Sequence, residues 1–135
     1  AGYYGLVSAT DEHIGHVLAA LRQSGLEGAT RVLYTSDHGD NLGARGLWGK
    51  STFFEESAGV PLILAGDGIP AGIERATPVS LVDVYPFVFE CVGATAPDDR
   101  ELPGISLAAL AAGQVPDRAV VSEYHATTSV AGAYM

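Results

Sequence analysis

Apolar residues along the first 24 positions recur with the spacing of one face of an α-helix. The sequence carries them at Tyr3, Val7, Ile14, Val17, Leu18 and Leu21. Gly25 follows the last of them, and glycine is the residue that most often ends a helix in the left-handed conformation. Leu26 is then placed to pack on Leu21, as in a Schellman cap. The pattern predicts a helix over residues 3–24.

Three later segments have the length and composition of β-strands. Residues 30–36 (TRVLYTS) are short, β-branched and aromatic, and residues 59–66 (GVPLILAG) form a second apolar run that Pro61 can begin. Both are apolar nearly throughout, which indicates strands buried on both faces. A third strand is predicted over residues 118–124 (RAVVSEY).

A helix is predicted within residues 80–93 (SLVDVYPFVFECVG), between the second and third strands. Asp83 is expected to cap its start, Pro86 fits the first turn, and Gly93 ends it. The side chains expected to point inward are Val84, Phe87, Val88 and Cys91.

A shorter helix is predicted over residues 107–112, with Ser106 as its cap and Gly113 as its stop. Helices that alternate with buried strands are typical of an α/β fold. The chain has 135 residues, 47% of them hydrophobic, which is enough for one core and too little for two. We therefore expect residues 1–135 to form a single domain. A helical pattern at the start and an extended pattern at the end suggest a domain that is only part of a longer protein.

Composition narrows the classes of partner. The chain carries 16 acidic and 7 basic side chains, a formal charge of −9, which disfavours binding to nucleic acid. No segment approaches the roughly 20 apolar residues of a membrane span, so no membrane partner is expected. Cys91 is the only cysteine, which excludes an intrachain disulfide. The cytoplasm is the first expectation for the compartment and the periplasm the alternative; a homo-oligomer is also compatible with the sequence.

The densest group of chemically active side chains follows the first predicted strand. Asp37 and His38 are adjacent at the strand end, and Lys50 comes at the end of a segment with four glycines. Ligands bind at the carboxyl ends of strands in open α/β sheets, and a glycine-rich loop can fold back to bring Lys50 to the same place. A carboxylate with an imidazole suits a divalent cation, and a lysine can stabilise an anion. This combination fits hydrolysis of an oxyanion ester. The alternative for Asp37 and His38 is a capping aspartate next to a surface histidine.

Several neighbouring residues have two interpretations each. Asp40 either orients His38 as a partner of a metal ligand or caps the loop. Arg45 either assists anion binding or is a surface arginine. His125, after the third predicted strand, either lines the substrate pocket or is an ordinary strand-end histidine. Glu55 and Glu56 are adjacent on a helical turn and point apart, which favours capping or salt bridging over paired catalysis.

The segment TSDHGDNLGARGLWGKSTFFEESAGVPLIL (residues 35–64) resembles the sulfatases of the alkaline phosphatase superfamily. Residues 3–21, 79–94 and 120–124 are similar to further segments of that family in the same order. The resemblance implies an alkaline-phosphatase-like three-layer α/β fold with a mainly parallel central sheet, of which this chain is a C-terminal part.

The resemblance also implies roles for residues. Asp37 and His38 would be metal ligands, and Lys50 would contact the sulfate and help the leaving oxygen. Many sulfatases have Asn at the position of His38 and bind Ca²⁺, whereas His38 is closer to the choline sulfatase and phosphonate monoester hydrolase branch, where Mn²⁺ is common. One divalent ion, Ca²⁺ or Mn²⁺, is therefore expected. The substrate implied is a small sulfate or phosphonate ester.

One element of the family is absent from the sequence. The formylglycine nucleophile arises from a Cys/Ser-X-Pro-X-Arg motif, and none of the 135 residues forms one; Cys91 is followed by VGATA. We expect that nucleophile outside this stretch, and we expect the stretch alone to be inactive. Two alternatives are a phosphonate or phosphate diester hydrolase on the same scaffold and a non-catalytic sulfatase-like module.

Overall fold

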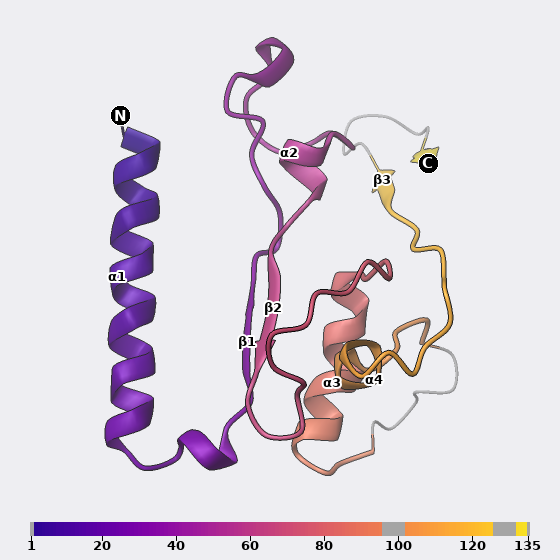
Figure 1. The fold of residues 1–135 in the computed structure, drawn as a ribbon. Helices are drawn as coiled ribbons and strands as arrows, with labels where there is room; N and C mark the ends of the chain where they lie inside the picture. The colour runs from indigo at the N-terminus through magenta and orange to yellow at the C-terminus, as the bar shows by residue number, and fades with distance from the viewer. Residues whose placement is uncertain (1, 96–101, 126–131, 135) are drawn as a thin grey trace.

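A computed structural model describes residues 2–95, 102–125 and 132–134 of the chain (Figure 1). The order of its main elements is α1 (Gly2–Gln23), β1 (Val32–Thr35), α2 (Glu55–Ala58), β2 (Leu62–Ala65), α3 (Val84–Cys91), α4 (Leu107–Ala111), β3 (Glu123–His125) and β4 (Gly132–Tyr134). Three 3₁₀ turns complete it: η1 (Glu27–Ala29), η2 (Ala44–Gly46) and η3 (Leu81–Asp83).

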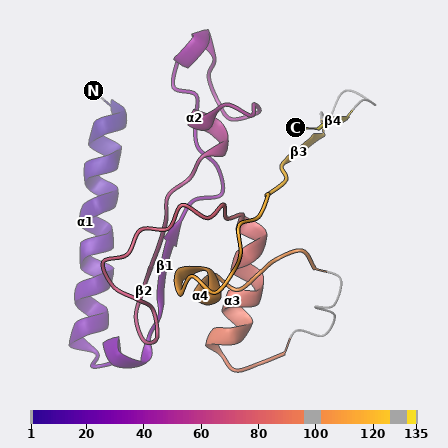
Figure 2. The same cartoon turned by 45° about the vertical axis from the view of Figure 1, so that its right-hand side comes forward.

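The first helix has the predicted extent but no covering partner. α1 ends before Gly25, whose φ of 73° is left-handed, as expected of the terminating glycine. None of its described residues is buried. The Schellman cap is not formed, because the Leu26 N–H donates to Ser24 Oγ and the Leu26 side chain is 58% exposed. α1 lies on the side of β1 and β2 opposite α3 and α4 (Figures 1 and 2).

The first two strands pair directly. β1 and β2 are antiparallel, with Leu33 opposite Leu64 and Tyr34 opposite Ile63. One face of the pair packs on α3 and α4, while Tyr34 and Ile63 on the other face are 38% and 59% exposed. The prediction that these two strands are buried on both faces is therefore wrong. The burial of β2 alternates along the strand, as in a ribbon covered on one side only.

The core is small and lies between the ribbon and the two helices after it. Phe87 of α3 and Leu107 and Leu110 of α4 are its buried residues. Leu33 and Leu64 pack against it from the ribbon. No helix in the described segments is long and apolar enough to cross a membrane.

The third helix has the predicted place but a different buried face. Phe87 is 3% exposed, as predicted, and Val84 packs on the core. Val88 is 48% exposed and Cys91 is also exposed, so the prediction that they point inward is wrong. The Cys91 sulfur instead accepts a hydrogen bond from Arg31 Nη1 at 3.6 Å.

Asp83 stands at the N-cap position of α3, but its side chain makes no capping hydrogen bond to that helix, so the predicted cap is not formed. It is completely buried; its Oδ2 accepts the Ser80 N–H at 2.8 Å and its Oδ1 accepts the Ile105 N–H at 2.9 Å. Arg118 Nη1 donates to both carboxylate oxygens at 3.0 Å. This network joins the chain before α3, the chain before α4 and the segment that leads to β3.

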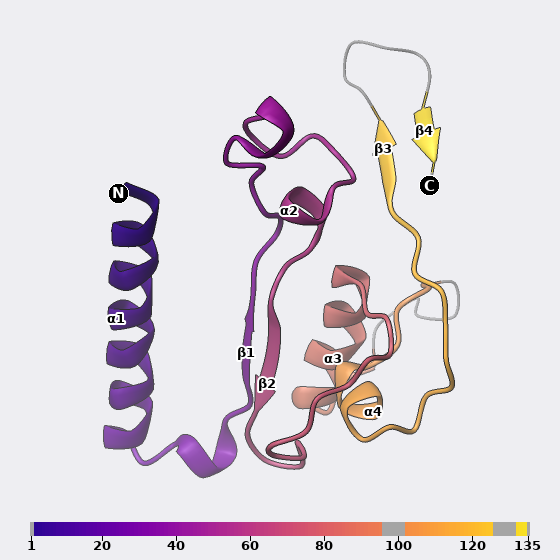
Figure 3. The same ribbon diagram turned by 45° about the horizontal axis from the view of Figure 1, so that its top comes forward.

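The last strands form a hairpin beyond the core. β3 pairs antiparallel with β4, with Tyr124 opposite Ala133, and the pair extends away from α3 and α4 (Figure 3). β3 begins at Glu123, later than the strand predicted over residues 118–124. Arg118 is held by Asp83 at that point instead.

Candidate active site

The loop between β1 and α2 is built on left-handed and tightly packed backbone positions. Gly43, Gly46 and Gly49 have φ values of 88°, 74° and 78°. Gly39 donates its N–H to Ser57 O at 2.8 Å, and a Cβ at Gly39 would lie 2.1 Å from the Glu56 carbonyl oxygen. A side chain at position 39 would therefore push the loop away from α2. These positions let the loop return to its starting point.

The returning loop brings Lys50 to the end of β1. Lys50 Nζ lies 2.5 Å from His38 Nε2, and Asp37 Oδ2 lies 3.3 Å from the same nitrogen. The structure thus places all three predicted residues in contact, although twelve positions separate His38 from Lys50. Asp37 is 82% exposed and the His38 side chain 39%, so the group is open to solvent.

The contacts of His38 select one tautomer of its ring. Nδ1 lies 2.8 Å from the Gly39 carbonyl oxygen, which can only accept, so Nδ1 carries a proton. A lysine ammonium can only donate, so Nε2 offers its lone pair to Lys50. His38 therefore presents Nε2 as an electron-pair donor beside the Asp37 carboxylate.

The electrostatic environment keeps Asp37 ionised. Partial desolvation acts to raise the pKa of Asp37, but the electrostatic interaction with the His38 ring, the N–H groups of His38 and Asp37, and the Lys50 ammonium together lower it. The net result is an Asp37 pKa below its ordinary value. An ionised carboxylate next to an imidazole lone pair is a donor set suited to a divalent cation of intermediate hardness. Within the described residues no third His, Cys, Asp or Glu completes a cluster with them.

A depression of about 540 Å³ opens beside these residues. Residues of the loop, of α2 and of the start of β3 line it. Asp37, His38 and Lys50 form one wall. The remaining walls come from residues 51–53, 57–60, 62, 79–81, 120, 122 and 123. Its size is that of a small-molecule site.

Arg45 has partners of its own on the loop. Its Nη1 lies 2.7 Å from Glu56 Oε2, and its guanidinium lies 4.2 Å from the centre of the Phe54 ring. Glu56 thus forms a salt bridge, as predicted. The hydrogen bond from Arg45 is the main cause of a lowered Glu56 pKa, followed by the Glu56 N–H, with desolvation opposing and the Arg45 charge adding. The role of Arg45 in substrate binding stays a prediction.

Asp40 and His125 complete the predicted set. Asp40 Oδ1 accepts the Leu42 N–H at 2.8 Å, which is the loop-capping interpretation of this residue. The His38 nitrogen that an orienting partner would hold is occupied by the Gly39 carbonyl. His125 is the last residue of β3, and its side chain lies outside the described part, so its role stays a prediction.

One residue at the site was not foreseen from the sequence. Asn41 is 1% exposed and hydrogen-bonds to the backbone of Gly49 and the side chain of Thr52, on either side of Lys50. An asparagine in a glycine-rich loop is most simply a turn residue, and only the folded loop shows that it is buried.

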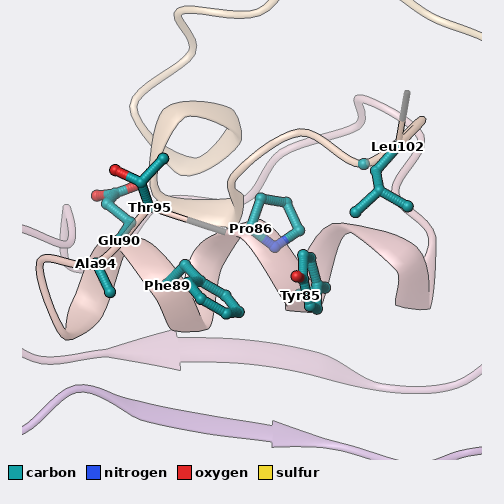
Figure 4. Close-up of a pocket in the computed structure, with 8 residues that line it drawn as sticks. Tyr85, Pro86, Phe89, Glu90, Ala94, Thr95 and Leu102 are labelled. Atoms are coloured by element: carbon teal, nitrogen blue, oxygen red, sulfur yellow. The ribbon is translucent and has the colours of Figure 1, made fainter. Parts of the chain in front are cut away.

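A second, smaller depression of about 210 Å³ lies beside α3 (Figure 4). Its floor is formed by Tyr85, Pro86 and Phe89, with Leu102 on the opposite side. Glu90 is the carboxylate in its lining. It forms a salt bridge with Arg31 at 3.3 Å and accepts a hydrogen bond from Ser106. Asp37, His38 and Lys50, the predicted site residues, line the larger depression instead.

The described part of the chain is thus an α/β scaffold that presents a carboxylate, an imidazole and a lysine side chain to one depression. A family model described as Sulfatase matches residues 1–94. The chain belongs to the sulfatase family.

Individual relatives agree with this assignment. The chain is 37% identical to "Arylsulfatase K" of Danio rerio over 139 residues, covering all of this chain and 27% of the relative. It is 39% identical to "Choline-sulfatase" of Rhizobium meliloti (strain 1021) over 130 residues, covering 96% of this chain and 25% of the relative. The chain thus spans about a quarter of the length of these relatives.

The fold is similar to that of solved structures. Phosphonate monoester hydrolase from Silicibacter pomeroyi superposes with a TM-score of 0.74 at 33% identity, over 84% of this chain and 22% of that protein. The α/β class and the alkaline-phosphatase-like fold predicted from the sequence are confirmed, with this chain forming a part of that fold.

Proposed function

We propose that this chain supplies part of the active site of a metal-dependent hydrolase that cleaves sulfuric esters. The observation that carries the proposal is the meeting of Asp37, His38 and Lys50 at one depression. Membership of the sulfatase family and similarity to two proteins named as sulfatases support it. The metal and the formylglycine are taken from the family.

Asp37 and His38 would hold the divalent ion, through a carboxylate oxygen and through Nε2. When bound, such an ion acts as a Lewis acid that polarises an ester oxygen and neutralises charge developing on it. Lys50 now occupies the His38 Nε2 lone pair and would turn away from it. Its flexible four-carbon chain is exposed, so it can reach toward an anion in the depression.

Lys50 would then donate hydrogen bonds to a sulfate oxygen and to the oxygen of the leaving alcohol. Charge grows on that leaving oxygen as the S–O bond breaks, so the ammonium stabilises the transition state more than the bound ester. The formylglycine nucleophile would come from sequence outside these 135 residues, which contain no Cys/Ser-X-Pro-X-Arg motif.

A phosphonate or phosphate ester is the second candidate substrate class. The specific observation in its favour is the likeness to phosphonate monoester hydrolase. Both reactions use the same three side chains, so relative rates decide between them. The full-length enzyme would be assayed on matched aryl sulfate and aryl phosphonate esters with one leaving group. A higher kcat/KM on the sulfate supports the first proposal, and a higher value on the phosphonate supports the second.

The metal assignment is tested by Asp37→Ala in the full-length enzyme. Loss of one of two local donors should remove the bound ion and hydrolysis while leaving the fold intact, because Asp37 is exposed and makes only local contacts. Metal content by elemental analysis and unfolding by circular dichroism measure the two effects. The matched control is Asp40→Ala, which removes a loop carboxylate that faces Leu42. Full metal content in the Asp37 variant would refute the assignment.

A further inference from the structure

Asn41 makes an unusual set of contacts for a loop residue. Its backbone N–H and its side-chain Nδ2 both donate to the Gly49 carbonyl oxygen, at 2.8 and 2.6 Å. Its Oδ1 accepts from Thr52 Oγ1 at 3.2 Å. One buried side chain therefore fixes the residue immediately before Lys50 and the residue two positions after it.

Lys50 itself is also held through its backbone. Ser57, 3% exposed, donates its hydroxyl hydrogen bond to the Lys50 carbonyl oxygen. The main chain of residues 49–52 is thus fixed from two sides while the Lys50 side chain stays exposed. A long side chain is directed by the position of its own backbone, so these contacts determine the region that Nζ can reach.

The geometry also explains why an amide is buried here. Both hydrogen bonds that a carbonyl oxygen ordinarily accepts are supplied to Gly49 by Asn41 alone. A shorter or apolar side chain would leave a part-buried carbonyl and the Thr52 hydroxyl short of partners. The loop would then regain hydrogen bonds by shifting toward water, and Lys50 would shift with it.

We propose that Asn41 is a positioning residue for Lys50, because it fixes the backbone from which the ammonium reaches the oxygen of the leaving group. This inference rests on the proposed function, because it assumes that Lys50 assists the leaving group. A misplacement of about 1 Å can cost up to about 100-fold in rate, even when the altered residue does not touch substrate.

The test measures kcat/KM of the full-length enzyme on a series of aryl sulfates whose phenol leaving groups differ in pKa. Lys50→Ala provides the reference, with an expected loss of about 100- to 1000-fold for the poorest leaving group and a smaller loss for the best. Asn41→Ala should show the same trend with a smaller amplitude, up to about 100-fold for the poorest. The control Asp40→Ala removes a loop hydrogen bond that does not bracket Lys50 and should keep the wild-type dependence on leaving group.

A double variant separates positioning from loss of fold. If Asn41 acts through Lys50, Asn41→Ala adds little in the Lys50→Ala background, since coupled residues are not additive. Equal losses for all leaving groups, or full additivity in the double variant, would overturn the inference. An unimpaired Lys50→Ala enzyme, or a wild-type enzyme inactive on every ester, would overturn the proposed function and the inference with it.

Thr52→Val protects the test against a misfolded Asn41 variant. It removes only the hydroxyl that donates to Asn41 Oδ1 and keeps the side-chain shape. We expect a several-fold loss with the same leaving-group trend and an unfolding midpoint near that of the wild type. If Thr52→Val lowers kcat/KM by the same factor for every leaving group, the proposal is contradicted, even if Asn41→Ala cannot be purified.

Discussion

Lys50 and Arg45 are two cations of the same glycine-rich loop with different neighbours. Lys50 contacts the imidazole of His38, whereas Arg45 is bound by a carboxylate and lies over an aromatic ring. Arg45 also has a left-handed φ of 55°, which costs free energy in a residue with a Cβ. The pairing with Glu56 offsets part of this cost, so Arg45 serves the shape of the loop in the structure described.

Arg45→Ala tests that pairing through its effect on the pKa of Glu56. Removing the guanidinium should raise the pKa of Glu56 toward its ordinary value, because the Arg45 hydrogen bond is the main cause of its lowering. A lowered folded-state pKa stabilises the fold above the ordinary glutamate pKa, and this contribution is lost as the pH falls through the folded-state value. Carbon-13 NMR titration of the Glu56 carboxyl in the intact protein measures the shift. Arg22→Ala, on α1, is the control, and an unchanged Glu56 pKa in Arg45→Ala would contradict the assignment.

The sequence was sufficient to place three of the chemically important residues together but not to explain how they are held. Asp37 and His38 are adjacent, and the glycines before Lys50 indicated a loop that folds back. Asn41 could not be singled out, because its burial depends on contacts with residues eight and eleven positions away. Such contacts leave no periodic signal in a sequence.

At the scale of elements, the local signals predicted well and the long-range partners did not. Ser106 and Gly113 bound α4 as predicted, with Ser106 Oγ accepting the Ala108 N–H. The side of α3 that is buried was only partly predicted, because it depends on where β1, β2 and α4 lie against it. Asp83 was predicted to cap α3, but its carboxylate makes no such hydrogen bond and instead binds Arg118, 35 positions away.

The Asp83–Arg118 pair should be the most sensitive polar contact of the described fold. Asp83→Ala leaves the 15% exposed Arg118 side chain without its carboxylate and two backbone N–H groups without their acceptor. We expect a loss of about 3–5 kcal/mol in the free energy of unfolding, the usual cost of breaking a buried pair. Chemical denaturation measures it. Asp117→Ala is the control, since Asp117 accepts an exposed hydrogen bond from the backbone N–H of Arg118. Equal midpoints for the two variants would show that the pair contributes little.

At the scale of the whole molecule, the described part has an uneven core. The buried apolar side chains lie in α3 and α4, on one side of the β1–β2 ribbon. On the other side, α1 carries exposed apolar residues that include Tyr3, Tyr4, Leu6 and Val17. A soluble helix with an uncovered apolar face lacks the packing that provides most helical stability in proteins.

This asymmetry predicts unequal protection from hydrogen exchange in the 135-residue chain studied alone. The amides of α1 should exchange at rates near those of an isolated helix, because none of its described residues is buried. The amides of α3 should exchange more slowly, because Phe87 is packed between the ribbon and α4. Hydrogen–deuterium exchange with peptide-level mass spectrometry compares the two helices in one sample, and Phe87→Ala serves as the control that should speed exchange in α3 and leave α1 unchanged. Slow exchange throughout α1 would mean that its apolar face is covered in solution, by a second copy of the chain or by a rearranged fold, and size-exclusion chromatography of the same sample separates these two cases.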